Sequence, residues 1–320
     1  MTPIKKSGPV LSCTKETVEV LKDAGFNVVT LANNHFRDQG DQGVKDTIDA
    51  LDSNGMLHVG GGINHTDAKK IHYHKTNEGI VAFINACEHE FSIAAENRGG
   101  SNGLDLIALY DSIIEAKRHS DFVLLIIHGG IELYQLPTPR MKKTYRFFID
   151  VGADAVVNHH QHCFSGYEIY KGKPIFYGLG NFCFDWEGRR NSILNRGYAV
   201  TLSLKEKIDY EIHPYLQCDE VPSVMLQDAA CYNADLDCLN KIISNDKLLE
   251  ECFIKLTNEK ERNFLYVMSP FDNRYIAALN RRGILKSLYP ERKLYAVKNM
   301  IWCESHREIL MEILNHSTDK

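Results

Sequence analysis

Short apolar runs alternate with helically spaced apolar residues through the first two thirds of the chain. The helical spacing predicts helices over residues 14–24, 41–54, 108–119 and 140–151. The short, β-branched or continuous apolar runs predict strands over residues 27–31, 56–59, 121–127 and 153–157. This alternation is typical of a layered α/β domain.

Two further segments have the pattern of β-hairpins. Residues 71–76 and 80–87 flank the turn at 77–79, and residues 167–170 and 174–177 flank the turn at 171–173. A triglycine at 60–62 predicts a flexible turn. It is no nucleotide fingerprint, because neither G-x-G-x-x-G leading into a helix nor a P-loop is present.

The pattern changes near residue 217. Beyond it strand signals fade, and helical spacing predicts helices over residues 236–243, 247–256, 273–279 and 305–314. We therefore expect an α/β domain over residues 1–217, followed by a mostly helical region over 218–320.

Composition excludes several classes of protein. With 320 residues, 44% hydrophobic and 25% charged, the chain has the composition of a globular protein. The net charge of −5 disfavours a nucleic-acid partner. No apolar run approaches the length of about 18 residues that a membrane span needs.

Cysteine usage and the first residues favour a cytoplasmic location. The nine cysteines are scattered without a C-x-x-C pair, so we expect reduced thiols, with Cys87, Cys163 and Cys183 buried. Residues 1–9 carry charge but lack the apolar core of a signal peptide.

Four polar clusters lie at or just beyond the ends of predicted strands. They are residues 33–35, residues 88–90, His128, and the group His159, His160 and His162. Ligands of open α/β sheets bind at the carboxyl ends of the strands. We therefore expect these clusters to share one site.

Histidine is the most informative residue type in these clusters. If the segment is extended, His160 and His162 point the same way, so their imidazoles can converge on one or two metal ions. His128 follows an apolar strand and precedes two glycines, which let the backbone approach a ligand closely. The alternatives are a polar loop with exposed histidines and a hydrogen-bonded core histidine.

Other polar residues are weaker candidates. Asn34 offers a neutral amide oxygen to a metal, and His35 could protonate a leaving group. Without a metal, these two residues would be an ordinary turn. Candidates for substrate binding are Glu88, His89, Arg98, Glu132 and Asn181. Each of these is also compatible with a solvated surface position.

The ordered motifs resemble the CapA-type family of capsule and poly-γ-glutamate biosynthesis proteins. The resemblance covers about residues 3–215 and rests on the following segments: L-A-N-N-H at 31–35, G-G-G at 60–62, C-E-H-E-F-S at 87–92, H-G-G at 128–130, H-Q-H at 160–162 and Y-G-L-G-N-F at 177–182. It implies a calcineurin-like metallophosphoesterase fold, an αββα sandwich with a two-metal site. It also implies that Asn34, His128, His160 and His162 are metal ligands and that His35 is the catalytic histidine.

The same resemblance implies that part of the pattern is missing. Family members begin with a strand carrying Gly-Asp and then an Asn-Leu-Glu segment, which supply acidic metal ligands. This chain opens with residues similar to those that follow Asn-Leu-Glu, so we expect an N-terminally incomplete sandwich with weak or single-metal binding of Mn, Fe or Zn. We also expect an exposed sheet edge that a second copy or a partner covers.

Three functions remain open from the sequence. The first is a metal-dependent phosphoesterase-type hydrolase, or a degenerate relative, acting on an anionic sugar, polyol or glutamate-polymer intermediate of capsule metabolism. The second is a non-catalytic capsule-assembly component that binds a polyanion or a partner enzyme. The third is a metal-dependent amide hydrolase that uses the same cluster.

Overall fold

The computed structural model describes residues 2–6, 8–205, 208–267, 273–284, 293–294, 297, 301 and 314. The chain divides into two compact units, residues 1–250 and 251–320. Within the described residues, no helix is long and apolar enough to cross a membrane.

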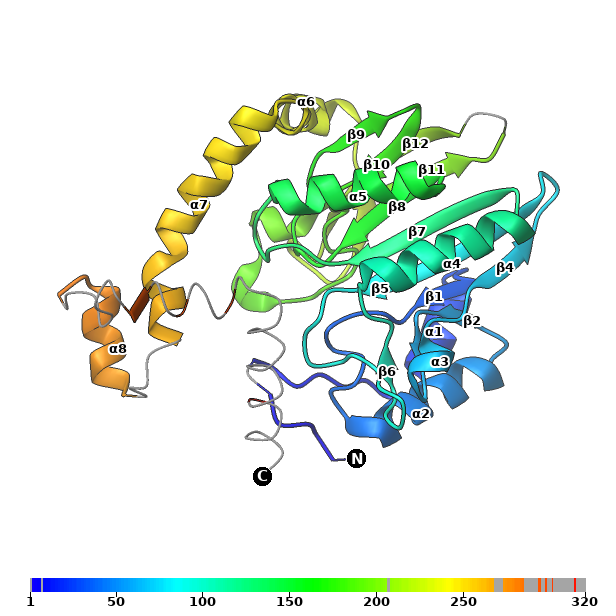
Figure 1. The fold of residues 1–320 in the computed structure, drawn as a ribbon, viewed down its shortest axis with the longest axis horizontal. Helices are drawn as coiled ribbons and strands as arrows, with labels where there is room; N and C mark the ends of the chain where they lie inside the picture. Colours follow the sequence, from blue (N-terminus) through cyan, green and yellow to red (C-terminus); the bar gives the residue numbers. More distant parts are fainter. Residues whose placement is uncertain are drawn as a thin grey trace. The chain divides into compact units, whose positions relative to one another are not determined.

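A mixed six-stranded sheet forms the centre of the first unit (Figure 1), with the strand order β4-β5-β7-β8-β10-β9. Its strands are β4 (His72–Lys75), β5 (Ile80–Cys87), β7 (Phe122–His128), β8 (Ala155–His159), β9 (Tyr167–Tyr170) and β10 (Lys173–Phe176). Strands β5, β7, β8 and β10 are parallel, whereas β4 and β9 pair antiparallel at the two edges. Because β5, β7 and β8 run in parallel, their carboxyl ends meet at one edge of the sheet.

Helices α4 (Leu106–His119) and α5 (Pro139–Val151) cover one face of this sheet. Each helix begins at a residue whose side chain accepts hydrogen bonds from the first turn, Asp105 for α4 and Thr138 for α5. Their inward faces bury Leu109, Ile113 and Phe148. These caps and apolar faces explain why the sequence pattern located both helices to within two residues.

A second sheet packs on the opposite face. It is antiparallel and consists of β11 (Arg196–Ser203), β12 (Asp209–Gln217) and β13 (Val224–Leu226). Leu202 of β11 packs against Val81, Leu124 and Ala155 of the central sheet. Two facing sheets, with helices on the outer face of the central one, confirm the predicted α/β class.

A smaller layer precedes the central sheet in the chain. Strands β1 (Val28–Thr30) and β2 (Leu57–Val59) pair in parallel and pack with α1 (Thr17–Asp23) and α2 (Gly40–Ser53) around Leu31, Leu51 and Met56. Beside them lie α3 (His65–Ala68) and a two-stranded pair, β3 (Gly61–Gly62) with β6 (Gly100–Ser101). The triglycine is therefore partly a strand, because Gly61 and Gly62 pair with residues 100 and 101.

The end of the first unit differs from the predicted boundary at 217. Helix α6 (Ala230–Ser244) packs on β9, and α7 (Asp246–Val267) begins before the first unit ends at Glu250. In the second unit the structure describes the rest of α7 and α8 (Arg274–Arg281), which agree with the helices predicted at 247–256 and 273–279. The helix predicted at 305–314 falls mostly outside the described residues. Whether residues 218–320 form a domain of their own stays a prediction.

Candidate functional site

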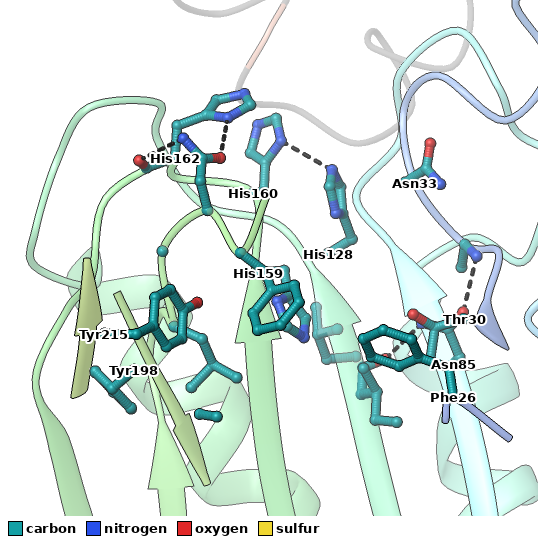
Figure 2. Close-up of a pocket in the computed structure, with 18 residues that line it drawn as sticks. Phe26, Thr30, Asn33, Asn85, His128, His159, His160, His162, Tyr198 and Tyr215 are labelled. Carbon is teal, nitrogen blue, oxygen red and sulfur yellow. Dashed lines mark hydrogen bonds between the residues drawn. The ribbon is translucent and has the colours of Figure 1, made fainter. Parts of the chain in front are cut away.

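Side chains from three strand ends meet at one edge of the central sheet (Figure 2). His128 is the last residue of β7, and its Nε2 lies 3.0 Å from Nδ1 of His160, just beyond β8. The same Nε2 lies 3.1 Å from Oδ1 of Asn34, in the loop after β1. The structure thus brings Asn34, His128 and His160 together, as the positions at strand ends predicted.

His162 lies beside this group but has a different partner. Its ring centroid is 6.4 Å from that of His160, and its Nδ1 lies 2.9 Å from Oδ1 of Asn181. Asn181 also donates to the carbonyl oxygens of His162 and Leu194. The pair His162–Asn181 therefore forms one wall of the site.

The segment that carries the two histidines is not extended, contrary to the expectation. His160 and His162 have positive φ angles of 114° and 59°, a region that residues with side chains seldom adopt. Between them Gln161 turns into the core, where its Nε2 donates to the carbonyl oxygen of Tyr177. The tight bend, rather than strand alternation, therefore places both rings on the same side. Such strain is common at functional sites.

Buried carboxamides hold the strand ends in register. Asn158 Nδ2 donates to the carbonyl oxygens of Gly129 and Tyr177 and to Oε1 of Gln161. Asn85 accepts from the backbone NH of Ala32 and donates to the carbonyl oxygen of Ile126. These two residues fix the histidine segments to one another and to the loop after β1. Neither residue was singled out from the sequence, although each is a polar residue inside an apolar strand.

Burial keeps the central histidine neutral. Burial, together with repulsion from His160 and other nearby histidines, lowers the pKa of His128 to about 2. Burial also lowers the pKa of His160, although Glu90 and Glu132 partly counteract it. A neutral imidazole has a lone pair for a cation.

A second polar group lies next to the first one. His35 Nδ1 is 2.7 Å from Oδ2 of Asp38, and Lys6 Nζ lies 2.6 Å from Oδ1 of Asp38 and 3.1 Å from His35 Nδ1. The side chains of Lys6 and Asp38 are 2% and 1% exposed, whereas that of His35 is 26% exposed. His35 is therefore held through Nδ1 while part of its ring remains accessible.

The charge of Asp38 is stabilised locally. Burial alone would raise the pKa of Asp38, but hydrogen bonds from Lys6, His35 and the backbone NH of Leu11 outweigh burial and lower it. Neither Asp38 nor Lys6 was singled out from the sequence, because a lone charged residue carries no sequence signal of burial.

The predicted substrate-binding residues lie in different places. Glu88 accepts from the backbone NH of Gly130 and forms an ion pair with Arg140. Exposed His89 lies over Gly103, and Glu132 is exposed close enough to His160 to act on its charge. Arg98 donates to the carbonyl oxygen of Ile93 within its own turn, and among the described contacts none joins it to the histidines. Their roles in substrate binding stay predictions.

Glu90 adds the nearest negative charge to the histidine group. Its Oε2 accepts from Asn34 Nδ2 at 3.2 Å, and its Oε1 lies 3.7 Å from His160 Nε2. The first contact turns the Asn34 oxygen toward His128. Glu90 thus orients Asn34 and faces the outer nitrogen of His160, as a carboxylate behind a metal-binding histidine does.

The donor set fits one cation better than two. In the described part of the chain, no group of three or more His, Cys, Asp and Glu side chains is placed to hold a metal ion. Asn34, His128 and His160 offer three neutral donor atoms with neighbouring separations of 3.0–3.1 Å. Ligands about 2.1 Å from an ion and at right angles to each other are about 3 Å apart. These residues can therefore share a single ion, and their assignment as ligands stays a prediction.

A cavity of about 510 Å³ adjoins the histidines. His128, His160, His162 and Asn181 line it together with the aromatic rings of Phe26, Phe182, Tyr198 and Tyr215 (Figure 2). The site thus combines polar groups at the strand ends with an apolar space between β1 and the second sheet.

Comparison with known proteins gives a consistent family. Residues 1–186 match the family described as "Bacterial capsule synthesis protein PGA_cap". The chain is 38% identical over 192 residues to "Capsule biosynthesis protein CapA" of Bacillus anthracis, covering 58% of this chain and 47% of that protein. It is 40% identical over 190 residues to "PGA biosynthesis protein CapA" of Bacillus subtilis, covering 58% and 50%. The chain therefore spans about half the length of the curated relatives it matches.

Two more distant matches are a curated relative and a solved structure. A "Probable polyglutamine synthesis accessory protein" of Mycobacterium tuberculosis is 31% identical over 177 residues, covering 51% of this chain and 46% of that protein. Among solved structures, a phosphatase of Mycoplasma pneumoniae aligns with a TM-score of 0.44 and 16% identity, over 67% of this chain and 77% of that one.

Proposed function

Since the chain belongs to the bacterial capsule synthesis protein PGA_cap family, we propose that it acts in the biosynthesis of a capsule or of poly-γ-glutamate, as a metal-dependent hydrolase of the phosphoesterase type. The observation that carries the hydrolase proposal is the meeting of Asn34, His128 and His160 next to the dyad of His35 and Asp38. The proposed substrate is an anionic sugar, polyol or glutamate-polymer intermediate. The proposed location is the cytoplasm, because scattered cysteines are typical of reducing compartments.

In this proposal one group of residues binds the cation and a second group supplies the proton. Asn34, His128 and His160 would hold a divalent cation (Mn, Fe or Zn), which would supply a Lewis acid for a phosphoryl oxygen and for water. Asp38 holds His35 through Nδ1, which leaves Nε2 of His35 to donate a proton to the leaving-group oxygen. Lys6 fixes Asp38 from the other side, so that the dyad keeps one orientation.

Turnover of p-nitrophenyl phosphate and bis-p-nitrophenyl phosphate with added Mn²⁺, Fe²⁺ or Zn²⁺ tests the hydrolase proposal. We expect His160→Ala to abolish metal-dependent turnover and His35→Ala to lower kcat by about 10²–10⁴-fold, the usual contribution of a general acid. His65→Ala is the matched control, because His65 is exposed on α3. Turnover that survives His160→Ala would contradict the proposal.

A non-catalytic binding role is the second candidate. It is favoured by the neutrality of the donor set and by the lack of a three-ligand group of His, Cys, Asp and Glu within the described residues. Absence of any His160-dependent turnover with all three metals, together with His160-dependent retention of the chain on immobilised poly-γ-glutamate, would favour this role over hydrolysis.

A further inference from the structure

A second cavity, of about 750 Å³, lies beside α2, β2 and the triglycine. It shares no lining residue with the cavity at the histidine site. Its polar lining includes two histidines from different strands, His58 of β2 and His72 of β4. Neither of them was singled out from the sequence.

Each of these histidines has a buried ring nitrogen without a partner. Within the described part of the chain, His58 Nδ1 and His72 Nε2 have no hydrogen-bond partner although both atoms are buried. Buried polar atoms are normally paired, so an unpaired one requires an explanation. Two unpaired nitrogens on residues that line the same cavity are accounted for if one ligand binds both of them.

The environment favours a cation as that ligand. His58 Nε2 lies 3.2 Å from Oδ1 of Asp52, so a proton on Nε2 leaves the lone pair on Nδ1. A carboxylate behind the outer nitrogen is the usual arrangement around a metal-binding histidine. The cavity is also lined by the aspartates 41, 49, 52 and 67 but only by the lysines 45 and 70. Its charge therefore opposes an anion.

The two histidines lie within electrostatic reach of each other and of a third one. Burial lowers the pKa of His72, and repulsion from His74 and then His58 lowers it further. His74 is two residues from His72 on β4, and their rings stack with centroids 6.4 Å apart. Of the two stacked rings, that of His74 is the exposed one.

We propose that His58 and His72 bind a divalent transition-metal cation, such as Zn²⁺, in the second cavity, with Asp52 orienting His58. Imidazole nitrogens prefer Zn²⁺, Ni²⁺ and Cu²⁺ over Mg²⁺ and Ca²⁺, which prefer oxygen ligands. Two protein ligands leave the remaining coordination positions to water, so the site is open and exchangeable rather than structural.

Equilibrium dialysis of the chelator-treated chain against Zn²⁺ tests this site. We expect His58→Ala and His72→Ala each to remove the same bound Zn²⁺, and Asp52→Asn to weaken its binding about tenfold or more. His65→Ala, an exposed histidine outside both cavities, should leave it unchanged. His160→Ala should also retain it, which separates this site from the proposed hydrolase site. Equal Zn²⁺ binding by the parent, His58→Ala and His72→Ala would overturn the proposal.

Modification of the unaltered protein gives a second measurement that needs no variant to fold. Diethylpyrocarbonate labels accessible imidazoles, and mass spectrometry locates the label. We expect Zn²⁺ to slow the labelling of His58 and His72 without changing that of exposed His65 and His119. Equal labelling rates at His58 and His72 with and without Zn²⁺ would reject the site.

Discussion

The buried ion pair between Lys6 and Asp38 links the start of the described chain to the candidate catalytic histidine. Both side chains are almost fully buried, and Asp38 also accepts from His35 and from the backbone NH of Leu11. A buried pair is weak evidence for stability as a whole, but removing one partner leaves an uncompensated charge. Loss of Lys6 should therefore leave the Asp38 carboxylate without its cation and, through Asp38, disturb the position of His35.

We expect Lys6→Met to destabilise the protein by about 3 kcal/mol, the lower end for a broken buried pair, because Asp38 keeps two other donors. Urea denaturation monitored by circular dichroism measures the change. Lys15→Met is the control, because Lys15 is 64% exposed and lies 3.9 Å from Asp46, and it should cost less than about 1 kcal/mol. Equal effects of the two variants would show that the Lys6 pair is not buried in solution.

The lowered pKa of Asp38 predicts a pH dependence with a definite sign. Its ordinary value is 3.8, and the folded protein holds it below that value. The stability that the carboxylate contributes is therefore fully present above pH 3.8 and is lost as the pH falls through the folded pKa. The difference in unfolding free energy between the parent and Asp38→Asn should be constant above pH 3.8. It should become smaller as the pH falls through the folded pKa of Asp38. A difference that is the same at every pH would contradict the shift.

Single residues also show what the sequence could predict of the site. Asn34, His128 and His160 could be grouped because each follows an apolar run, and parallel strands end at one edge. The prediction that Cys183 is buried was wrong: it is exposed and lies outside the helices and strands, whereas Cys87 and Cys163 are buried. Contacts such as Lys6 with Asp38, 32 positions apart, depend on the path of a loop and leave no periodic signal.

At the scale of elements, Asn158 joins three strands. It lies in β8, and its amide donates to acceptors beyond β7, within the histidine bend and beyond β10. Its own Oδ1 accepts from the hydroxyl of Tyr145 on α5. One buried side chain therefore fixes the relative positions of the strand ends that carry His128 and His160.

Asn158→Asp tests this role with little change in shape. The carboxylate would face the three oxygens that now accept from the amide, so we expect a loss of at least about 3 kcal/mol in unfolding free energy. Asn77→Asp, in the exposed turn between β4 and β5, should change it by less than about 0.5 kcal/mol. Thermal unfolding of both variants measures the difference, and an Asn158→Asp protein as stable as the parent would contradict this role of the amide.

Elements with a strong sequence pattern could be predicted, and those with a weak one were missed. Strands β7 and β8 were predictable because each is a continuous apolar run of strand length. Helices α4 and α5 were predictable because their apolar residues have helical spacing and their lengths are typical of helices. Strands β11 and β12 were missed. Alternating Tyr198, Val200 and Leu202 could have indicated β11, but Pro214 within β12 argues against a strand in a single-sequence pattern.

At the scale of the whole molecule, the region after residue 217 completes the first unit. β13 pairs with β12, the hydroxyl of Tyr232 donates to the carbonyl oxygen of Tyr215, and Asn240 accepts from the backbone NH of Tyr167. Lys142 of α5 contacts the carbonyl oxygen of Ile243 and pairs with Asp246. Because of these tertiary contacts, the first compact unit extends to residue 250. Such contacts could not be predicted from the weaker strand pattern after residue 217.

Two fragments test which boundary is correct: residue 217, as the sequence predicts, or residue 250, as the structure indicates. A fragment of residues 1–250 keeps the buried side chains of α6, including Tyr232, Leu236 and Ile243, and should unfold cooperatively with a melting temperature close to that of the full chain. A fragment of residues 1–217 exposes the surface under α6. It also leaves the carbonyl oxygen of Tyr215 and the backbone NH of Tyr167 without their partners, Tyr232 and Asn240. It should therefore melt at a lower temperature or aggregate, because it loses both apolar burial and buried hydrogen bonds. Differential scanning calorimetry of the two fragments beside the full chain measures this, and equal melting temperatures for both fragments would restore the boundary at 217.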